Sequence, residues 1–335
     1  MKSLGPNRYA LAIGAAAALL GGCGGSQLPI GAPGAMARTH AIVVRVDRAN
    51  SQAVRAPAKD GWSGDLLYVA TGGDVYVLSY PSGKVVGRLG FPGYSLCSDN
   101  HGNVFVVGGD QAVAEYSHRG KLVETLSIYD VPSGCSVDPT TGNLAVPTYD
   151  YSCVYIYPDA QSGGVQSVCN DEFILVGLCA YDSDGNLFLD GAVAAGPHHS
   201  QIPGLAELPK GSTTFRNYLL PSRFGYDDYD SVNWDGAHIA LSNPNTHAIY
   251  RMHVAHKAKI IGTTRVHGWV GGFGRGGAGG TQTWLKDGEF IAQWGSNPQL
   301  AIWSYPTGGK PIKVLPAFAS AGTSVDGVVL SPAPH

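Results

Sequence analysis

The chain has 335 residues, including 47 glycines and 21 prolines, and only 14% of its residues are charged. Charged residues make up about a quarter of a typical soluble domain, so this composition favours short strands joined by many turns and argues against a helical protein. The net charge is -3, and no run of Lys or Arg occurs, which excludes an electrostatic case for binding nucleic acid or an anionic membrane surface.

The first 23 residues are predicted to be a lipoprotein signal peptide with its lipobox. Lys2 and Arg8 give a short basic segment, and residues 9–20 form an apolar stretch that is too short to span a bilayer. The stretch ends in Leu20-Gly21-Gly22-Cys23, which resembles a bacterial lipobox, although Gly21 stands where Ala or Ser is more common. The resemblance implies that Cys23 is lipidated and that its acyl chains anchor the protein. The alternative is an ordinary signal peptide in which Cys23 has no role.

Residues 24–60 are predicted to form a flexible tether, because they are rich in Gly, Ala, Pro and Ser. Within them, residues 40–46 have the composition of a strand (HAIVVRV) and could add an edge strand to the domain. The domain itself is predicted to occupy residues 61–335. The number of repeats described next requires residues 40–46 to lie outside the folded ring.

A repeat begins near residue 64. A polar turn with a glycine precedes an apolar run six times, and the glycines lie 38, 40, 43, 51 and 52 residues apart. The six glycines are Gly64, Gly102, Gly142, Gly185, Gly236 and Gly288. Glycine at a fixed place in a turn predicts a backbone with positive φ. A second hairpin recurs later in the units, with turns such as Pro81-Ser82-Gly83, and a short strand ending in Asp precedes the glycine turn.

These repeats predict four short strands per unit, lettered A to D. Six units of about 40 to 50 residues are typical of propeller blades, and no segment has a sustained helical period. We therefore predict an all-β, six-bladed β-propeller of four-stranded antiparallel blades. The first unit lacks strand A, while residues 327–332 resemble the A strand at residues 134–139. The C-terminal strand is therefore predicted to complete blade 1 and cover its open edge.

With these motifs the chain resembles β-propellers of the NHL-repeat and YVTN-repeat kind. It looks especially like bacterial envelope lipoproteins with Tyr-Pro-x-Gly hairpins, here Tyr305-Pro306-Thr307-Gly308, and Cys-x-x-Asp phrases followed by Gly-Asn, here Cys179 to Asn186. The resemblance covers residues 64–335. It implies an architecture and an envelope location, but no activity.

One disulfide is predicted from strand register. If Tyr157 faces Val165 across a hairpin, Cys153 lies directly opposite Cys169. Opposed residues on antiparallel strands have Cβ atoms within reach of a disulfide, and export would place them in an oxidising compartment.

Three further cysteines, Cys97, Cys135 and Cys179, are interpreted as occupying one repeat position on successive inner strands. Buried small side chains near a crowded axis are the favoured explanation. A zinc site made of three thiolates is an alternative, and so is a disulfide between two of them. The five cysteines after Cys23 leave at least one without a partner in the chain.

Other motifs do not amount to a metal or cofactor site. Residues 182–186 (DSDGN) resemble the start of a calcium loop, but the downstream Glu is absent. Asp99, Asp138, Asp182 and Asp235 recur at one position, which turn formation explains. The glycines at 274, 276 and 279 match a dinucleotide fingerprint, but no predicted helix follows them. We predict no metal, no cofactor and no catalytic residues.

The loops that join strand B to C and strand D to the next A emerge on one face of a propeller. Here they are longer and more aromatic than the turns of the other face, and loops on a rigid scaffold commonly carry function. The predicted ligand-binding residues are Tyr149, Tyr151, Tyr226, Asp227, Asp228, Tyr229, Trp269 and Trp294. Tyrosine and tryptophan beside carboxylates suit sugar stacking or peptide contact. The alternative is that these rings pack between blades.

The resulting hypothesis is a non-catalytic binding or scaffold protein of the cell envelope, exported to the periplasm or cell surface. It would be monomeric, held to the membrane only by its N-terminal lipid, and would bind an envelope protein or a glycan but no nucleic acid. One alternative is a metal-dependent hydrolase or lyase resembling the gluconolactonase family, which would need a set of metal ligands in the central channel. Another is a structural component of a surface assembly.

Overall fold

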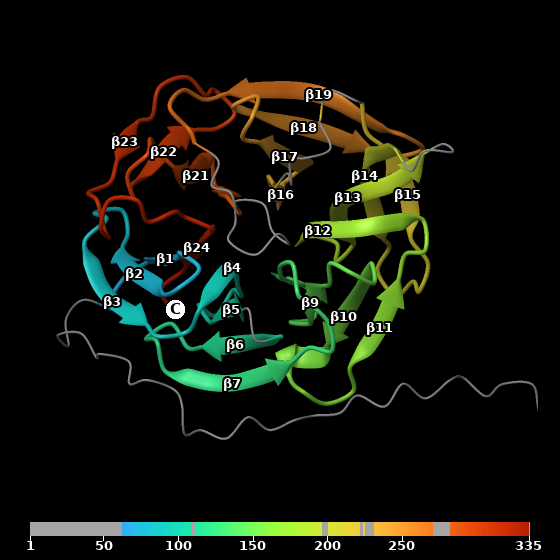
Figure 1. Ribbon diagram of the computed structural model, residues 1–335, viewed down its shortest axis with the longest axis horizontal. Coiled ribbons are helices and arrows are strands. Elements are labelled where there is room, and N and C mark those ends of the chain that lie inside the picture. Colours follow the sequence, from blue (N-terminus) through green and yellow to red (C-terminus); the bar gives the residue numbers. More distant parts are fainter. Residues whose placement is uncertain are drawn as a thin grey trace, which may run out of the picture. The chain divides into compact units, whose positions relative to one another are not determined.

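The computed structural model describes residues 62–108, 111–195, 200–221, 224, 231–270 and 282–334. Six four-stranded antiparallel sheets are arranged around a common axis as the blades of a propeller (Figure 1). The predicted fold class is therefore confirmed. The predicted signal peptide, the tether and the strand-like residues 40–46 lie outside the described residues. Within the described ranges, no helix combines the length and the apolar composition needed to cross a membrane.

The first three blades follow the chain from inner to outer strand. Blade 1 contains β24 (Gly327–Ser331), β1 (Leu66–Ala70), β2 (Val75–Ser79) and β3 (Val85–Leu89). Blade 2 contains β4 (Gly93–Ser98), β5 (Val104–Gly108), β6 (Ala112–Tyr116) and β7 (Leu122–Ser127). Blade 3 contains β8 (Ser136–Val137), β9 (Leu144–Pro147), β10 (Cys153–Tyr157) and β11 (Gln166–Cys169), with the short 3₁₀ turn η2 (Pro158–Ala160) between the last two.

The other three blades repeat the arrangement. Blade 4 contains β12 (Phe173–Tyr181), β13 (Leu187–Ala195), β14 (Ser200–Leu208) and β15 (Arg216–Leu219). Blade 5 contains β16 (Ser231–Trp234), β17 (Ile239–Asn243), β18 (Ala248–Val254) and β19 (Ala258–Arg265). Blade 6 contains β20 (Trp284–Lys286), β21 (Glu289–Gln293), β22 (Leu300–Ser304) and β23 (Lys313–Val314).

The core lies between blades, because each sheet buries both of its faces. Successive residues of a strand point to opposite sides, and in β1 Leu66 and Tyr68 pack with blade 2 residues such as Leu96, whereas Leu67 packs with blade 6 residues such as Ile291. All five residues of β1 are buried. This two-sided burial explains why the second strand of each blade is an almost continuous apolar run rather than an alternating one.

The repeat glycines form the predicted turns. All six have positive φ, between +77° and +95°. The recurring aspartates close the same turns: Oδ1 of Asp99 accepts hydrogen bonds from the backbone N–H of His101 and Asn103, at 2.9 and 2.8 Å. Asp182 repeats this arrangement with Asp184 and Asn186. These hydrogen bonds agree with turn formation as the role of the aspartates.

The C-terminal strand closes the ring as predicted. β24 pairs antiparallel with β1, so that Leu330 lies opposite Leu67. The side chain of Ser331 is fully buried, donates to the carbonyl of Gly102 at 2.6 Å, and lies 2.7 Å from Nδ1 of His118. Nε2 of His118 lies 3.1 Å from the carbonyl oxygen of Gly64. One imidazole of blade 2 therefore holds together the two chain segments that meet in blade 1.

Trp62 is the first residue that the structure describes. Its indole is buried in the apolar cluster between blades 1 and 2 and lies directly against Gly87 and Gly120, where a side chain would collide with the ring. Gly120 belongs to the turn between β6 and β7. The absence of a side chain at these two glycines is what allows Trp62 to pack there.

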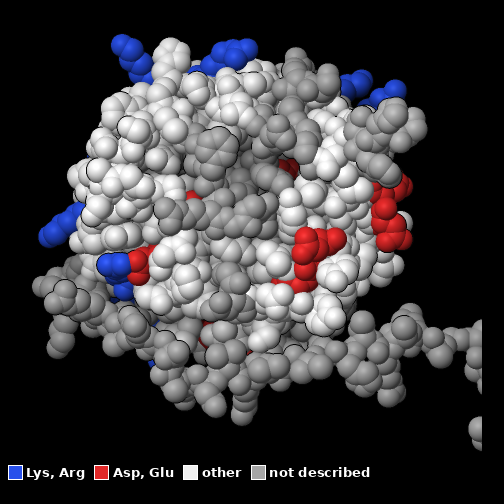
Figure 2. Space-filling model, viewed as in Figure 1, with Lys and Arg blue, Asp and Glu red and all other residues white. Residues whose placement is uncertain are grey.

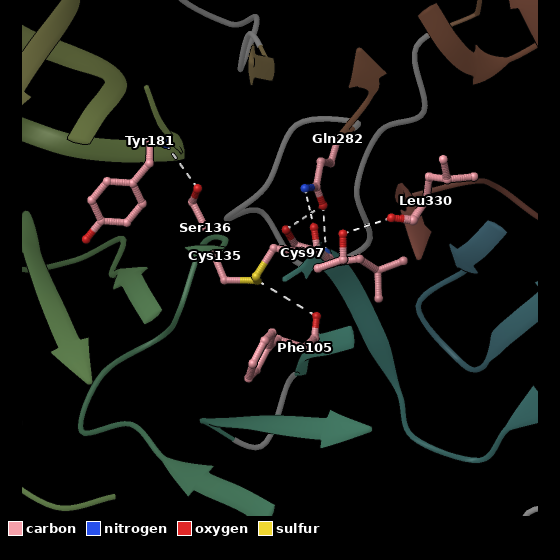
Figure 3. The surroundings of a disulfide bond; sticks show 10 residues. Cys97, Phe105, Cys135, Ser136, Tyr181, Gln282 and Leu330 are labelled. Carbon is pink, nitrogen blue, oxygen red and sulfur yellow. Dashed lines mark hydrogen bonds between the residues drawn. A yellow bond between two sulfur atoms is a disulfide. The ribbon is translucent and has the colours of Figure 1, made fainter. Parts of the chain in front are cut away.

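A disulfide joins the inner strands of blades 2 and 3. It links Cys97 to Cys135, with Cα atoms 5.6 Å apart (Figure 3), and it realises one of the alternatives for the three inner cysteines. Cys179 is free and buried. Burial, with a smaller contribution from the charge of Asp190, raises the pKa of its thiol, which makes it a poor nucleophile.

The structure corrects the interpretation that the three cysteines share one repeat position. Cys97 precedes Asp99 of its turn by two residues, whereas Cys135 precedes Asp138 by three, as Cys179 precedes Asp182. A shift of one residue turns a side chain to the opposite face of a strand. Cys97 thus points to blade 3 and Cys135 points back to blade 2, so the pair meets in a disulfide and does not form a three-thiolate site.

Candidate functional site

The two faces of the ring differ in charge. We call the face with the B-to-C and D-to-A connections the connection face, and the other the opposite face. The acidic residues in the described connections of the connection face are Asp74, Asp130, Asp150, Asp171, Glu172 and Asp326. None of the described residues in those connections is Lys or Arg. The turns of the opposite face contain both signs of charge, with Lys84, Arg119, Lys121, Lys210, Lys257 and Lys310 beside Asp99, Asp138, Asp159, Asp182, Asp184, Asp235 and Asp287. In Figure 2 basic side chains lie at the rim of the face drawn, and acidic ones also lie well inside it.

The structure separates the eight residues predicted to bind a ligand. Tyr226, Asp227, Asp228 and Tyr229 lie outside the described residues. Trp269 is only 1% exposed and packs edge-to-face on Phe290, with ring centroids 5.2 Å apart. It forms an isolated β-bridge with Trp294, which is half-buried against the same cluster. Trp269 therefore belongs to the core between blades 5 and 6 and offers no ring to a ligand.

Tyr149 and Tyr151 lie on a rigid pair of connections in blade 3. The connection before β8 (residues 128–135) and the connection between β9 and β10 (residues 148–152) are joined by backbone hydrogen bonds from Tyr149 N–H to Val131 and from Ser133 N–H to Pro147, both of 2.9 Å. Pro132 and Thr148 also form an antiparallel bridge. Two loops from different parts of the chain thus behave as one short ribbon.

Asp130 completes this junction. The carboxylate is buried and accepts hydrogen bonds from Val131 N–H at 2.7 Å and from Tyr151 N–H at 3.3 Å. A buried carboxylate that accepts backbone hydrogen bonds orders the loops that donate them. The backbone beneath Tyr129 and Tyr151 is therefore fixed before any ligand arrives.

Two tyrosine side chains of this ribbon face solvent. Tyr129 is 80% exposed and Tyr151 is 64% exposed. Burial, with a smaller contribution from the charge of Asp130, raises the pKa of the Tyr155 phenol on β10. Tyr129 and Tyr151 are thus exposed on joined loops above the buried carboxylate of Asp130.

A third connection borders this surface. Cys153 and Cys169 face each other in the predicted register and are joined by a disulfide. Next to it, Asn170 N–H donates to Ser152 at 2.9 Å, and the amide groups of Asn170 and Asn217 bond reciprocally at 2.8 and 3.2 Å. Asp171 and Glu172, the next two residues, are exposed.

We call residues 128–135, 148–152, 155 and 170–172 together the tyrosine platform. Sequence reasoning identified Tyr149 and Tyr151 but missed Tyr129 and Tyr155. A signal for Tyr129 was present, because Tyr129-Asp130 in a D-to-A connection repeats the Tyr149-Asp150 pair. For Tyr155 no sequence signal distinguishes it from a strand residue that packs inward.

The platform has the chemistry of a contact surface. Exposed phenol rings stack and donate hydrogen bonds, and the neighbouring carboxylates accept them. In the part of the chain that the structure describes, no group of three or more His, Cys, Asp or Glu side chains is arranged to hold a metal ion.

Comparisons with known proteins place the chain by fold alone. No family model matches it, and no curated protein matches its sequence. A chain of the nidogen–laminin complex is 11% identical, with a TM-score of 0.58, and covers 81% of this chain and 100% of its own. A protein of unknown function from Bacteroides caccae is 12% identical, with a TM-score of 0.59 over 80% of this chain and 99% of its own. A functionally unknown protein from Desulfotomaculum acetoxidans is 13% identical, with a TM-score of 0.50 over 83% and 89%.

Proposed function

We propose that this protein is a lipid-anchored binding or scaffold protein of the cell envelope, without catalytic activity, that holds an envelope protein or glycan on its connection face. The observation that carries the proposal is the tyrosine platform, in which Tyr129 and Tyr151 are exposed on a backbone fixed by hydrogen bonds and flanked by a disulfide. Large exposed aromatic surfaces on a rigid scaffold are typical of sites that contact another molecule.

The proposed location has two supports. The disulfides Cys97–Cys135 and Cys153–Cys169 fit an exported protein, because such bonds persist in oxidising compartments. The lipobox-like sequence ending in Cys23 supports an anchor made of acyl chains. The fold also suits a partner protein, since one of the similar structures is a chain of a complex between nidogen and laminin.

Photo-crosslinking of the full, anchored chain tests this function. A photoreactive phenylalanine analogue replaces Tyr151, and a matched one replaces Ile312, which is 62% exposed in a turn of the opposite face. In intact cells the probe at position 151 should yield a discrete crosslinked protein or glycan, and the probe at position 312 should not. Equal crosslinking from both positions, or none from position 151, would refute a binding role for the platform.

A further inference from the structure

The exposed carboxylates of the tyrosine platform are not used in ion pairs within the described parts of the ring. Some acidic residues elsewhere are paired, for example Asp74 with Arg88 and Asp235 with Arg251 at 2.8 Å. None of the ion pairs among described residues involves Asp150, Asp171 or Glu172, although all three are exposed. Their charge is therefore available to a partner.

The tyrosine rings attract positively charged groups, as the carboxylates do. The face of a phenol ring is negative because of its quadrupole and attracts ammonium and guanidinium groups. The molecule already contains this geometry, because the guanidinium of Arg88 lies 5.3 Å from the ring centroid of Tyr76 and that of Arg251 lies 5.2 Å from Tyr305. Tyr129 and Tyr151, exposed beside unpaired carboxylates, offer the same arrangement to a group from outside.

The backbone of the platform is already ordered, which favours tight binding of a partner. The backbone at residues 129–133 and 147–151 is already paired, so that binding costs little ordering of the loops. Tyrosine has only two side-chain torsions, which keeps the cost of fixing its ring low.

Building on the proposed function, we infer that the partner of the tyrosine platform is a cationic protein segment, whose Arg or Lys side chains lie over Tyr129 and Tyr151 and pair with Asp150, Asp171 and Glu172. An anionic partner, such as an acidic polysaccharide or a phosphorylated segment, would meet like charge and no described Lys or Arg in these connections. A neutral glycan would stack on the rings but leave the carboxylates' charge unused.

Peptide binding to the full mature chain tests the inference. The probes are a nine-residue peptide of alternating Arg and Gly, the same peptide with Gln in place of Arg, and the neutral sugar maltohexaose, measured by calorimetry at two salt concentrations. The Arg peptide should bind, the Gln peptide and the sugar should not, and the affinity should fall as salt rises.

Variants locate the binding site. Tyr129→Ala and Tyr151→Ala should each weaken Arg-peptide binding about twofold to fivefold, while the Phe variants, which keep the ring, should bind nearly as the natural chain does. The triple change Asp150→Asn, Asp171→Asn and Glu172→Gln should weaken it on the order of tenfold. Asp159→Asn removes an exposed carboxylate of the same blade on the opposite face and serves as the matched control.

The outcomes separate this inference from the binding role. Equal binding of the Gln and Arg peptides, or binding of maltohexaose that Tyr151→Ala abolishes and salt leaves unchanged, overturns the cationic partner while the platform remains a binding site. Crosslinking from position 151 without any binding of the Arg peptide does the same. Arg-peptide binding that is lost equally in Asp159→Asn also overturns the inference, because it then reflects net charge rather than the platform.

Discussion

Ser136 occupies in blade 3 the position that Cys97 occupies in blade 2, two residues before the aspartate of the inner turn. Its neighbour across the interface is β12 of blade 4, where Tyr181 N–H donates to Ser136 Oγ at 3.1 Å. On that strand Cys179 precedes its turn aspartate by three residues, as Cys135 does. The two positions that a disulfide joins between blades 2 and 3 therefore recur between blades 3 and 4, with serine in place of one cysteine.

The change Ser136→Cys should therefore create a second bond between blades. We expect the new thiol at position 136 to pair with Cys179 and to raise the free energy of unfolding by about 2–4 kcal/mol, because the new bond closes a long loop in the unfolded chain. Peptide mapping without reduction should show residues 136 and 179 linked. Ser136→Ala, which removes the hydroxyl without adding a thiol, is the control. If Cys179 can still be alkylated in unfolded, unreduced Ser136→Cys protein, the positional equivalence is wrong.

The closure of the ring should be sensitive to a single methyl group at Gly102. Gly102 has φ +85°, and a Cβ there would collide with the carbonyl oxygen of Pro332 and the ring of His118. Gly236 has a similar φ of +95° but open space around it. Gly236→Ala should cost about 1–2 kcal/mol of unfolding free energy from backbone strain alone. Gly102→Ala should cost more, and denaturant unfolding of both variants measures the difference. Equal losses would show that the closure tolerates displacement of Pro332.

His118 should make stability depend on pH. Burial lowers the pKa of His118 below its ordinary value, against opposing contributions from Gly64 and Asp65. The unfolded chain therefore binds a proton more readily than the folded chain, so the free energy of unfolding falls as pH drops below about 6.5. The variant His118→Gln cannot titrate there and should show a shallower decrease between pH 7 and pH 5. Thermal unfolding across this range checks it, and parallel curves for both proteins would contradict the assignment.

Cys23 is the predicted attachment point of the anchor. In cells supplied with a radiolabelled fatty acid, the natural chain should incorporate label and sediment with membranes. Cys23→Ser should lose both properties, since a hydroxyl does not accept the diacylglycerol group that the lipobox resemblance implies. The disulfide variant Cys153→Ser, with Cys169→Ser, keeps Cys23 and serves as the control. Label retained in Cys23→Ser would point to another acylated residue, and absence of label from the natural chain would favour the ordinary signal peptide.

The sequence was sufficient for the ring because its repeat carries conformational constraints. Glycine at a fixed place in the turn required positive φ, and the surplus A-type strand at residues 327–332 had only one open edge to fill. The hairpin of Cys153 and Cys169 was predictable for the same reason, since register in an antiparallel pair follows from one opposed pair.

The sequence-based predictions that were wrong concern the direction of side chains and the contacts between blades. Cys97 and Cys135 differ by one residue relative to their turns, and that parity decides which neighbour each faces. Trp269 was predicted to be a ligand-binding residue because it lies in a connection. A residue in a connection can still bury its ring, and Trp269 packs against Phe290 of the next blade. The tyrosine platform arises from Val131 meeting Tyr149 across two loops, a contact without a sequence pattern.

Trp62 lies at one pole of the ring. Its indole contacts Gly120, in a turn of the opposite face, so the described chain begins on the side away from Tyr129 and Tyr151. Substitutions at this end of the described chain therefore leave the surface around the two tyrosines untouched, and the packing of the ring can be altered separately from its exposed aromatic surface.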